Sequence, residues 1–402
     1  MGTLREIIAL SPDELAREFD SINVDEGGIG IMSPKAFFHL LRLRALKSPA
    51  ANILKQEMLS VGGECATSRT VILGDPVAQD VIIMGTRRQL AKLSARLKAQ
   101  PFGLKQVARQ ITAFIKNTSQ NPPPLPSLMS SLAINPSRYP LLMGVLNVTP
   151  DSFSDGNCYL EENAAIQHGM TLYEQGAEMI DVGGESTRPG SDPVPEEEEL
   201  RRVLPVIRRL REQTDRPISI DTMKAPVAVE ALEAGANLVN DVSAGRHDPR
   251  MLEVVAQAGC PYVMMHMQGE PKTMQQNPHY DHLMDELHRF FDERLAWAVK
   301  RAVKEEQIII DPGIGFGKCR EDNYEILRRL RELRVFGRPV LVGVSRKSFL
   351  QNELGEVPKE RYEESIAAGT IAMVNGADIL RVHEVVPALK SRIVFQRLIG
   401  RT

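Results

Sequence analysis

Four residues that follow separate apolar runs in the second part of the sequence could together bind a flat heterocycle. Asp221, Asn240 and Asp311 offer carboxylate and amide groups, and Lys347 offers a cation. Groups of this kind can pair with a ring that is rich in N–H and C=O functions. The sequence therefore predicts a site for a polar aromatic ring, although each aspartate taken singly could instead cap a helix.

A second set of residues is cationic and suits phosphate. It comprises Arg188 in GGESTRPG, Arg346 and Lys347 in SRKS, and Arg381 with His383 in RVHE. A guanidinium can grip phosphate oxygens through two parallel hydrogen bonds, and neighbouring cations offset the charge on a departing phosphate. We therefore expect a phosphorylated substrate. The alternative for any single arginine is an ion pair with Asp or Glu at the rim of the fold.

The glycine-rich stretch DPGIGFGK at 311–318 invites comparison with nucleotide-binding loops. It matches neither GxxxxGK[ST] nor GxGxxG, because Pro312 and Lys318 stand where those motifs require glycine. We expect the glycines to let the backbone approach a ligand closely, with Phe316 offering an apolar face.

The metal-binding signals in the sequence are weak. His279, His282 and His288 lie close together but form no HExxH motif, so we interpret 281–297 as an exposed helix with solvated histidines. A Mg²⁺ ion held by one or two oxygens and a phosphate would leave little trace in a sequence, and Asn147 could be its protein ligand.

The residues in both sets follow short apolar runs, which predict parallel strands covered on both faces because the runs do not alternate with polar residues. The runs are 141–148, 178–184, 217–222, 238–243, 262–268, 307–313, 339–345 and 379–384. Intervening stretches such as 161–176, 196–213, 281–305 and 360–376 have helical patterns. These β/α units predict a (β/α)₈ TIM barrel.

A doubly wound open sheet would give the same local signals as a barrel. The polar residues at the strand ends favour the barrel, because closing the sheet gathers those ends around one mouth. These residues are Asn147, Asp181, Asp221, Asn240 with Asp241, His266, Asp311, Ser345 to Lys347, and Arg381 with His383.

The composition of the chain indicates which class of protein it belongs to. The chain has 402 residues, of which 43% are hydrophobic and 25% charged, and a net charge of −3, as in a globular protein with a sizeable core. It has no apolar run long enough to span a bilayer and no signal peptide. Its four cysteines form no CxxC pair, so we expect free thiols and a cytoplasmic protein.

The first third of the chain has a different character. We expect a small α/β domain at 1–120, with a capping box at Ser11 and Glu14, two helices within 35–60, and strands at SRTVILG and DVIIMG. A Pro/Ser-rich linker is expected at 121–137. A probable helix carries Arg87, Arg88, Lys92, Arg96 and Lys98, but it lacks interleaved aromatic residues, so we interpret it as a solvated surface and do not expect nucleic acid binding.

Eight motifs in order over 138–402 resemble bacterial dihydropteroate synthase: LNVTPDSFSDG, DVGGESTRPG, SIDTMK, NDVS, MHMQGEPKTM, DPGIGFGK, SRKS and RVHE. The resemblance implies a homodimeric (β/α)₈ barrel that joins 4-aminobenzoate to 6-hydroxymethyl-7,8-dihydropterin diphosphate and releases pyrophosphate in folate synthesis. About 137 residues precede the matching region, and nothing in them resembles the pyrophosphokinase or aldolase that some organisms fuse to this enzyme. Their role, and the chain's sensitivity to sulfonamides, stay open.

The resemblance also assigns residues. It implies a pterin pocket of Asp221, Asn240, Asp311 and Lys347, diphosphate contacts at Thr187, Arg381 and His383, and Asn147 at a Mg²⁺ ion. It places 4-aminobenzoate among Arg188, Pro189, Phe316, Lys347 and Ser348, with loops 149–160 and 186–195 as lids. The implied catalytic groups are Asp221, Asp311, Lys347, Arg381 and His383.

Two alternatives remain at this point. A pterin-dependent methyltransferase shares the Asp, Asn and Asp contacts but has no diphosphate to hold, so ESTRPG, SRKS and RVHE distinguish the two enzymes. A catalytically silent barrel could also serve as a pterin-binding scaffold.

Overall fold

The computed structural model describes residues 4–5, 7, 12–119, 125–149, 158–187, 190–351 and 361–399. The chain forms two compact units, Met1–Ser119 and Gln120–Thr402. Each unit has an apolar core of its own.

The second unit is built on an eight-stranded sheet in the order β10-β11-β4-β5-β6-β7-β8-β9, in which all neighbours are parallel. The strands are β4 (Leu141–Asn147), β5 (Met179–Gly183), β6 (Ile218–Asp221), β7 (Leu238–Asp241), β8 (Tyr262–Met265), β9 (Ile308–Asp311), β10 (Leu341–Gly343) and β11 (Ile379–Val382). A parallel bridge between Ile310 and Val340 joins the two ends of the sheet, which closes it. The predicted (β/α)₈ barrel is therefore confirmed.

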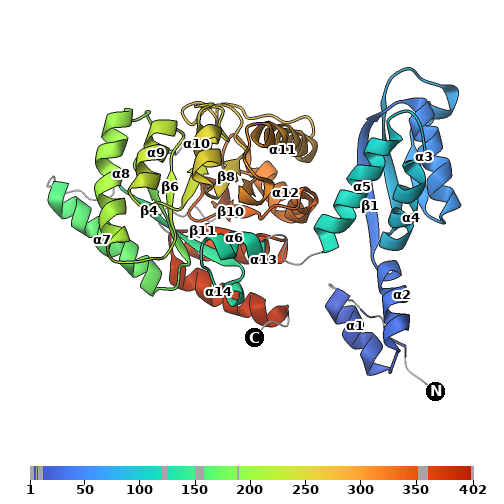
Figure 1. Ribbon diagram of the computed structural model, residues 1–402, viewed down its shortest axis with the longest axis horizontal. Helices are drawn as coiled ribbons and strands as arrows, with labels where there is room; N and C mark the ends of the chain where they lie inside the picture. Colours follow the sequence, from blue (N-terminus) through green and yellow to red (C-terminus); the bar gives the residue numbers. More distant parts are fainter. Residues whose placement is uncertain are drawn as a thin grey trace. The chain divides into compact units, whose positions relative to one another are not determined.

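Helices surround the strands, as Figure 1 shows. They are α7 (Cys158–Glu174), α8 (Glu196–Arg211), α9 (Ala225–Glu233), α10 (Met251–Ala258), α11 (Leu283–Lys300), α12 (Arg320–Arg329), α13 (Tyr362–Val374) and α14 (Val385–Leu398). Helix α8 illustrates how the sequence sets their bounds. Its first turn is four glutamates and its last turn holds three arginines, which suits the helix dipole at both ends.

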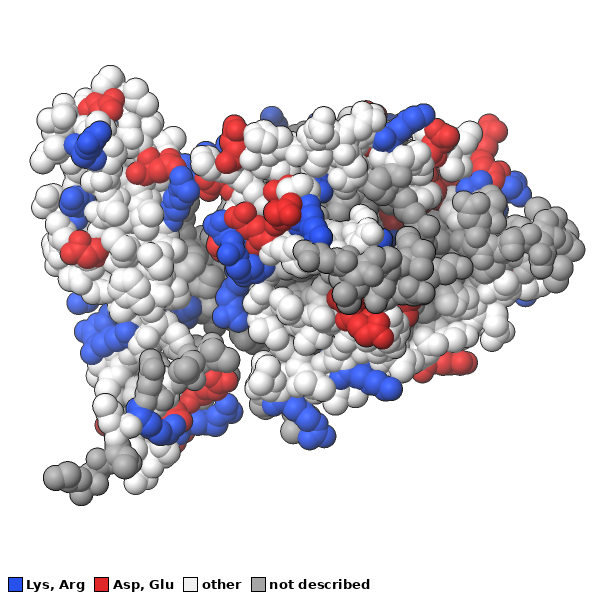
Figure 2. Space-filling view, turned by 180° about the vertical axis from the view of Figure 1, so that it is seen from behind, with Lys and Arg blue, Asp and Glu red and all other residues white. Residues whose placement is uncertain are grey.

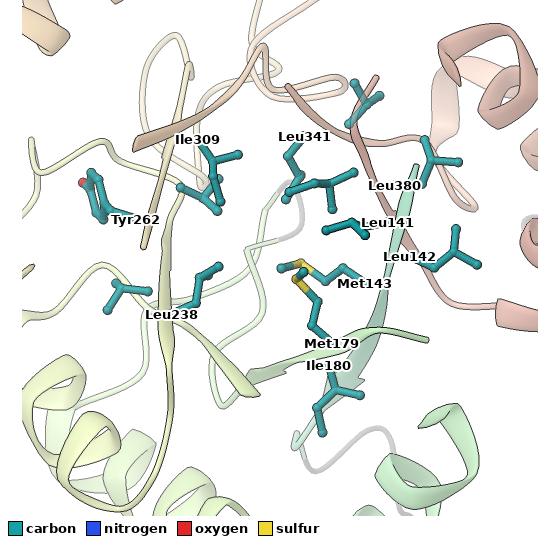
Figure 3. Close-up of a cluster of buried hydrophobic side chains, with 14 of the residues drawn as sticks. Leu141, Leu142, Met143, Met179, Ile180, Leu238, Tyr262, Ile309, Leu341 and Leu380 are labelled. Atoms are coloured by element: carbon teal, nitrogen blue, oxygen red, sulfur yellow. The ribbon is translucent and has the colours of Figure 1, made fainter. Parts of the chain in front are cut away.

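Side chains alternate between the barrel interior and the helices along each strand. In Figure 3, Met143 and Met179 meet inside the barrel, whereas Ile180 and Leu380 point away from its centre. Because the period of a strand is two residues, Asp181 lies on the same face as Met179, and Arg381 lies on the face opposite to Leu380. The alternation therefore directs these two charged side chains into the barrel.

The Pro/Ser-rich segment differs from the expected linker. It contains helix α6 (Leu125–Ser131), and Leu128, Met129 and Leu132 are buried in the core of the barrel unit. Helix α6 contacts the turn Glu305–Gln307 that leads into β9, so it covers the amino-terminal end of the barrel. Pro126 lies in the first turn of the helix, where proline is tolerated, and the run LMSSL supplies the apolar residues.

The first unit is a small α/β fold, as predicted. Three antiparallel strands in the order β1-β3-β2 pack against helices. Its elements are α1 (Pro12–Ser21), α2 (Glu26–Ala36), β1 (Phe38–Leu46), α3 (Ser48–Ser60), β2 (Glu64–Thr67), β3 (Gln79–Thr86), α4 (Arg87–Leu97) and α5 (Leu104–Ser119).

Two local predictions in the first unit are wrong. A strand, β1, replaces the first of the two helices expected within 35–60, because Leu41 and Leu43 alternate with exposed Arg42 and Arg44. The stretch SRTVILG holds a 3₁₀ turn at Val71–Leu73 in place of a strand, whereas DVIIMG does lie in β3. The expected capping box involves Ser11, which lies outside the described residues.

The described residues show mixed charges on the surface and free cysteines. Basic side chains are interspersed with acidic ones on the face shown in Figure 2. Cys65, Cys260 and Cys319 are free thiols. No helix among the described residues combines the length and the apolar character needed to cross a membrane.

The packing of α6 gives a stability prediction. Leu128 is 1% exposed, so replacing it with alanine removes apolar contacts and leaves a cavity. We expect L128A to lower the free energy of unfolding, measured in urea, by about 2–5 kcal/mol. The exposed Ser130 provides the control S130A. Equal stability of L128A and S130A would mean that the segment is only a linker.

Candidate functional site

The carboxyl ends of the first four barrel strands stand at the same level. Asn147 of β4 is in register with Gly183 of β5, Gly183 with Asp221 of β6, and Asp221 with Asn240 of β7. A Cβ built on Gly183 would lie 3.8 Å from Asp221 Oδ2 and 3.9 Å from Asn147 Oδ1. The glycine therefore leaves the two polar groups facing one another across a gap with no side chain.

Arg381 of β11 joins these strands across the barrel. Its Nε donates to Asp181 Oδ2 at 2.7 Å and its Nη2 donates to Asp221 Oδ2 at 2.8 Å. Asn240 Nδ2 donates to the same Asp181 oxygen at 2.9 Å. We call these four residues the Arg381 network. It connects β5, β6, β7 and β11 although its members are up to 200 residues apart in the chain.

The Arg381 network leaves acceptors unused. Asp181 is 0% exposed and Asp221 is 7% exposed, and the Oδ1 atom of each has no hydrogen-bond partner among the described residues. Burial, together with the nearby Asp181 carboxylate, raises the pKa of Asp221. Burial opposes the charge of Arg381, but the two carboxylates outweigh it and raise its pKa. Arg381 therefore stays charged, and a ligand that donates hydrogen bonds would satisfy the free oxygens.

Asp311 and Lys347 form a second part of the site. Asp311 Oδ1 accepts a hydrogen bond from the Gly313 amide at 2.7 Å, and burial raises the pKa of the carboxyl group while Lys347 opposes the rise. Burial lowers the pKa of Lys347 to about 8, against the influence of Asp311. The Lys347 ammonium donates to the Ile314 carbonyl and lies 4.6 Å from the centre of the Phe316 ring.

The two parts of the site adjoin one another. A Cβ on Gly343 would lie 3.7 Å from Arg381 Cβ and 3.9 Å from Lys347 Nζ. The Asp221 and Arg381 charges also contribute to the pKa of Lys347. The structure thus brings the whole predicted heterocycle set, Asp221, Asn240, Asp311 and Lys347, to one mouth of the barrel.

The cationic set is brought together only in part. His383 Nδ1 lies 3.0 Å from Ser345 Oγ at the mouth. Arg346, in contrast, is exposed and forms an ion pair with Glu384, so the rim ion pair is the correct interpretation for this arginine. Arg188 and Pro189 lie outside the described residues, as does 150–157 of the first expected lid.

Thr187 lies at the start of the second expected lid, and a buried ion-pair cluster precedes it. Lys224 Nζ donates to Glu185 and to Glu199, a glutamate that is 0% exposed. The cluster fixes the beginning of the loop to α8 and to the segment after β6.

The apolar part of the site lies around Phe316 and Ser348. Phe316 packs against a small cluster of Met223, Val242, Met265, Met267 and Met274. Ser348 is exposed and begins a 3₁₀ turn after Lys347. Ser348 also lines a cleft of about 530 Å³, together with Gln275, Gly315, Lys318, Cys319 and Asn323.

The described residues hold no group of three His, Cys, Asp or Glu side chains that could hold a metal ion. Asn147, half-buried at the end of β4, supplies one neutral amide oxygen. Such an oxygen fits Mg²⁺ where a substrate phosphate and water supply the other ligands, and it does not fit a site made of protein ligands alone.

The sequence-based interpretation of the histidines was wrong in one detail. His279 is exposed beside Asp281, as expected, but His288 is partly buried on α11 against Phe336. One face of α11 is buried through Leu283, Met284, Leu287, Phe291 and Ala298, so the helix is only half exposed.

Sequence reasoning missed two features of the site. Asp181 lies in a predicted strand but belongs to neither predicted set, although it accepts hydrogen bonds from both Arg381 and Asn240. Lys318 was considered only as a residue that breaks a motif, yet it is 2% exposed and its Nζ lies 2.9 Å from His266 Nδ1. Its position directly after the glycine-rich loop was the only available signal.

Comparison with known proteins shows the family that this chain resembles. Residues 143–383 match the model of a family described as pterin binding enzyme. The dihydropteroate synthase of Synechocystis sp. is 46% identical over 265 residues, which make up 66% of this chain and 91% of that protein. The dihydropteroate synthase of Escherichia coli is 45% identical over 247 residues, 61% of this chain and 87% of that protein.

A relative from Halobacterium salinarum also matches the first unit. This probable bifunctional folylpolyglutamate synthase/dihydropteroate synthase is 38% identical over 389 residues, 95% of this chain and 46% of that protein. Because the match spans 95% of the chain, it includes most of the first unit.

Solved structures resemble the barrel unit. Xanthomonas albilineans dihydropteroate synthase with 4-aminobenzoic acid has a TM-score of 0.62 and 45% identity, covering 66% of this chain and 95% of that one. The same enzyme in complex with 7,8-dihydropteroate has a TM-score of 0.60 and 42% identity, covering 67% of this chain and 97% of that one.

The Arg381 network gives a prediction about stability. Replacing Arg381 with methionine leaves two buried carboxylates without their cation, which costs about 3–5 kcal/mol. The pKa of Asp221, already raised by burial, then rises further, so protonation of this group relieves the cost as the pH falls. We expect urea unfolding of R381M to show a larger loss at about pH 8 than at about pH 5.

A double-variant cycle supplies the control for this prediction. The variant R381M/D181N should lose less stability than the sum of the two single variants, because D181N removes one of the unpaired charges. Exposed Arg328 provides the matched control R328M. Additive losses that do not change with pH would contradict the network.

Proposed function

The chain belongs to the pterin binding enzyme family, within which it is a dihydropteroate synthase, and we propose that the Arg381 network and the loop 311–318 together form its active site. The enzyme is a transferase that joins 4-aminobenzoate to 6-hydroxymethyl-7,8-dihydropterin diphosphate and releases pyrophosphate. The observation that carries the proposed site is the pair of buried carboxylates with free oxygens beside Arg381.

The pterin ring occupies the space above Asp221, Asn240, Asp311 and Lys347. The free Asp221 Oδ1 accepts a hydrogen bond from an N–H group of the ring, since a buried acceptor without a partner is costly. Asn240 is held by Asp181, which fixes the orientation of its amide. This support explains why Asp181 is buried beside the pocket.

The reaction exchanges a C–O bond for a C–N bond at the pterin methylene. The C–O bond to the diphosphate breaks first, and the resulting cation is spread over the ring. The carboxylates of Asp221 and Asp311 stabilise this positive charge. The neutral amine of 4-aminobenzoate then attacks the methylene, and the nitrogen loses one proton to water or to the released pyrophosphate, so no strong base is required.

Arg381 and His383 receive the departing pyrophosphate, with Thr187 at the start of the neighbouring loop. A guanidinium has five N–H donors, and the bonds to Asp181 and Asp221 use two of them. The remaining donors of Arg381 can bind phosphate oxygens without breaking the network. The same residue therefore orders the pterin carboxylates and offsets the charge of the leaving group.

The second substrate, 4-aminobenzoate, lies against Phe316, Lys347 and Ser348, with Arg188 and Pro189 from the adjacent loop. Phe316 offers an apolar face that is backed by the methionine cluster. Ser348 and the cation of Lys347 suit the carboxylate of the substrate. This division leaves the diphosphate to Arg381 and the aromatic acid to the loop 311–318.

Mg²⁺ is proposed as the cofactor, with Asn147 as its protein ligand. When bound, the ion neutralises charge on the diphosphate. One neutral amide at this position agrees with an ion that arrives with its phosphate.

A homodimer is proposed because two adjacent helices of the barrel carry exposed apolar side chains. Helices α13 and α14 pack against each other. Ile371 and Val374 of α13, and Ile393, Val394 and Leu398 of α14, are between 42% and 66% exposed. A second copy of the chain would cover this surface.

A cytoplasmic location is proposed because Cys65, Cys260 and Cys319 are free thiols, which persist in a reducing compartment.

The activity is tested by mixing the two substrates and measuring pyrophosphate. We expect release that depends on 4-aminobenzoate and a rate that falls by about 10²–10³-fold in kcat/KM for R381A, because one preorganised cation is lost. Arg328, an exposed arginine of α12, provides the control R328A, which should keep the wild-type rate. A methyltransferase or a silent scaffold would release no pyrophosphate.

The metal proposal has its own test. Chelation of divalent ions should abolish turnover, and added Mg²⁺ should restore it. The variant N147A should raise the Mg²⁺ concentration needed for half-maximal rate by about tenfold, because it removes the protein oxygen. An unchanged Mg²⁺ requirement in N147A would remove Asn147 from the metal site.

A further inference from the structure

We propose that Lys318 is a positioning residue for 4-aminobenzoate, because its buried ammonium fixes the loop 311–318 and thereby the ring of Phe316. This inference rests on the proposed function of the site. Lys318 is only 2% exposed, and lysine is almost never buried to this extent unless it is paired. The buried Lys318 ammonium therefore requires groups that pair with it at the barrel mouth.

The ammonium group connects the ends of two strands. Lys318 Nζ donates to the Phe316 carbonyl at 3.0 Å, within its own loop. It lies 2.9 Å from His266 Nδ1 and 3.4 Å from the His266 carbonyl, both directly after β8. One side chain thus ties the loop after β9 to the loop after β8.

The electrostatic surroundings of Lys318 and His266 agree with a hydrogen bond in which Lys318 Nζ donates to His266 Nδ1. Burial, followed by the Lys318 and Arg246 charges, lowers the pKa of His266 well below its usual value, so the ring is neutral. Its Nδ1 is then free to accept when the proton is on Nε2. Burial also lowers the pKa of Lys318, to about 7, while Asp311 opposes the fall. The nearby Asp311 carboxylate therefore favours the charged form of Lys318, and the amine can donate hydrogen bonds whether or not it is charged.

The rest of the loop 311–318 is held in the same manner. Successive carbonyls each accept a hydrogen bond from a different side chain. Ile314 accepts from Lys347, Gly315 from Gln275, Phe316 from Lys318, and Gly317 from Tyr280. The loop is a rigid platform in which each residue has a set position.

Close backbone contact with the loop after β8 explains the glycines. A Cβ on Gly313 would lie 1.9 Å from the His266 carbonyl oxygen, and one on Gly317 would lie 2.3 Å from the Gln268 carbonyl oxygen. Both glycines have positive φ angles. Glycine permits the approach, and Lys318 supplies the hydrogen bonds that hold it.

The hydrogen bonds of Lys318 should matter more for the binding of 4-aminobenzoate than for the binding of the pterin. Phe316 belongs to the proposed 4-aminobenzoate surface, and its own carbonyl is bound by Lys318. Two of the four pterin groups, Asp221 and Asn240, are held instead by the Arg381 network on β6 and β7. A third, Asp311, belongs to the loop but is held at its first residues by the Gly313 amide. Loss of the ammonium should therefore loosen the 4-aminobenzoate surface more than the pterin pocket.

The test is a steady-state comparison of K318M with the wild-type full chain. We expect the KM for 4-aminobenzoate to rise by about tenfold or more, and the KM for the pterin diphosphate to change by less than about threefold. Exposed Lys300 of α11 provides the matched control K300M, with both KM values unchanged. A general loss of structure would instead reduce the active fraction without separating the two KM values.

A pair of His266 variants tests the same hydrogen bond if K318M does not fold, as judged by circular dichroism. The variant H266N keeps an acceptor near the position of Nδ1, whereas H266L removes it. H266N should keep the KM for 4-aminobenzoate closer to the wild-type value than H266L does. Equal values for H266N and H266L, or equal changes of both KM values in K318M, would overturn the proposal. A wild-type chain without turnover would instead overturn the proposed function.

Discussion

Two carboxyl groups, those of Asp181 and Asp221, are buried at the mouth of the barrel and share a single guanidinium as their ion-pair partner. Removing a carboxylate from water is costly, so the arrangement persists only because Arg381 donates to both and Asn240 adds a further bond. The cation must come from β11, the last strand, whereas the carboxylates come from β5 and β6. The active site therefore depends on the pairing of the last strand, β11, with the first, β4, which brings Arg381 close to β5 and β6.

The number of donors on Arg381 also explains why one residue can serve two purposes. Arg381 fixes the carboxylates on the pterin side and keeps further donors for the leaving phosphate. The loop 311–318 begins at the pterin group Asp311 and carries Phe316 for the other substrate, and its carbonyls are fixed by different bonds, from Lys347, Gln275, Lys318 and Tyr280. The two substrates thus meet at the border between two rigid surfaces with separate supports. Such preorganisation is the usual source of electrostatic stabilisation in enzymes.

Much of this arrangement could be predicted from the sequence, because it follows from strand periodicity. Apolar runs identified all eight strands, and the polar residue at the end of each run identified the mouth. Residues such as Asp221 and Asn240 are in register, so their proximity needs only the strand order. The roles assigned to them, and those of Thr187 and Ser348, stay predictions that rest on the resemblance and the proposed function.

The errors arose where a local pattern depends on distant contacts. Proline and serine at 121–137 gave no sign that Leu128 would pack under the barrel. In β1, Leu40 obscured the alternation of Leu41 with Leu43 and made the segment look helical. Arg346 and Arg381 were equally plausible phosphate ligands, and only the structure pairs the exposed Arg346 with Glu384 and directs Arg381 inward. Apart from its place beside the glycines, Lys318 gave no signal, because its partner His266 lies 52 residues away, directly after β8.

The most direct test of the account is calorimetric measurement of pterin binding to the wild-type chain between about pH 5 and about pH 8. Burial and Asp181 raise the pKa of Asp221, so its carboxyl group is neutral at the acid end of this range and becomes an anionic acceptor as the pH rises. The account predicts that pterin affinity increases with pH. An affinity that is constant, or strongest at the acid end, would contradict the claim that these buried carboxylates bind the ring.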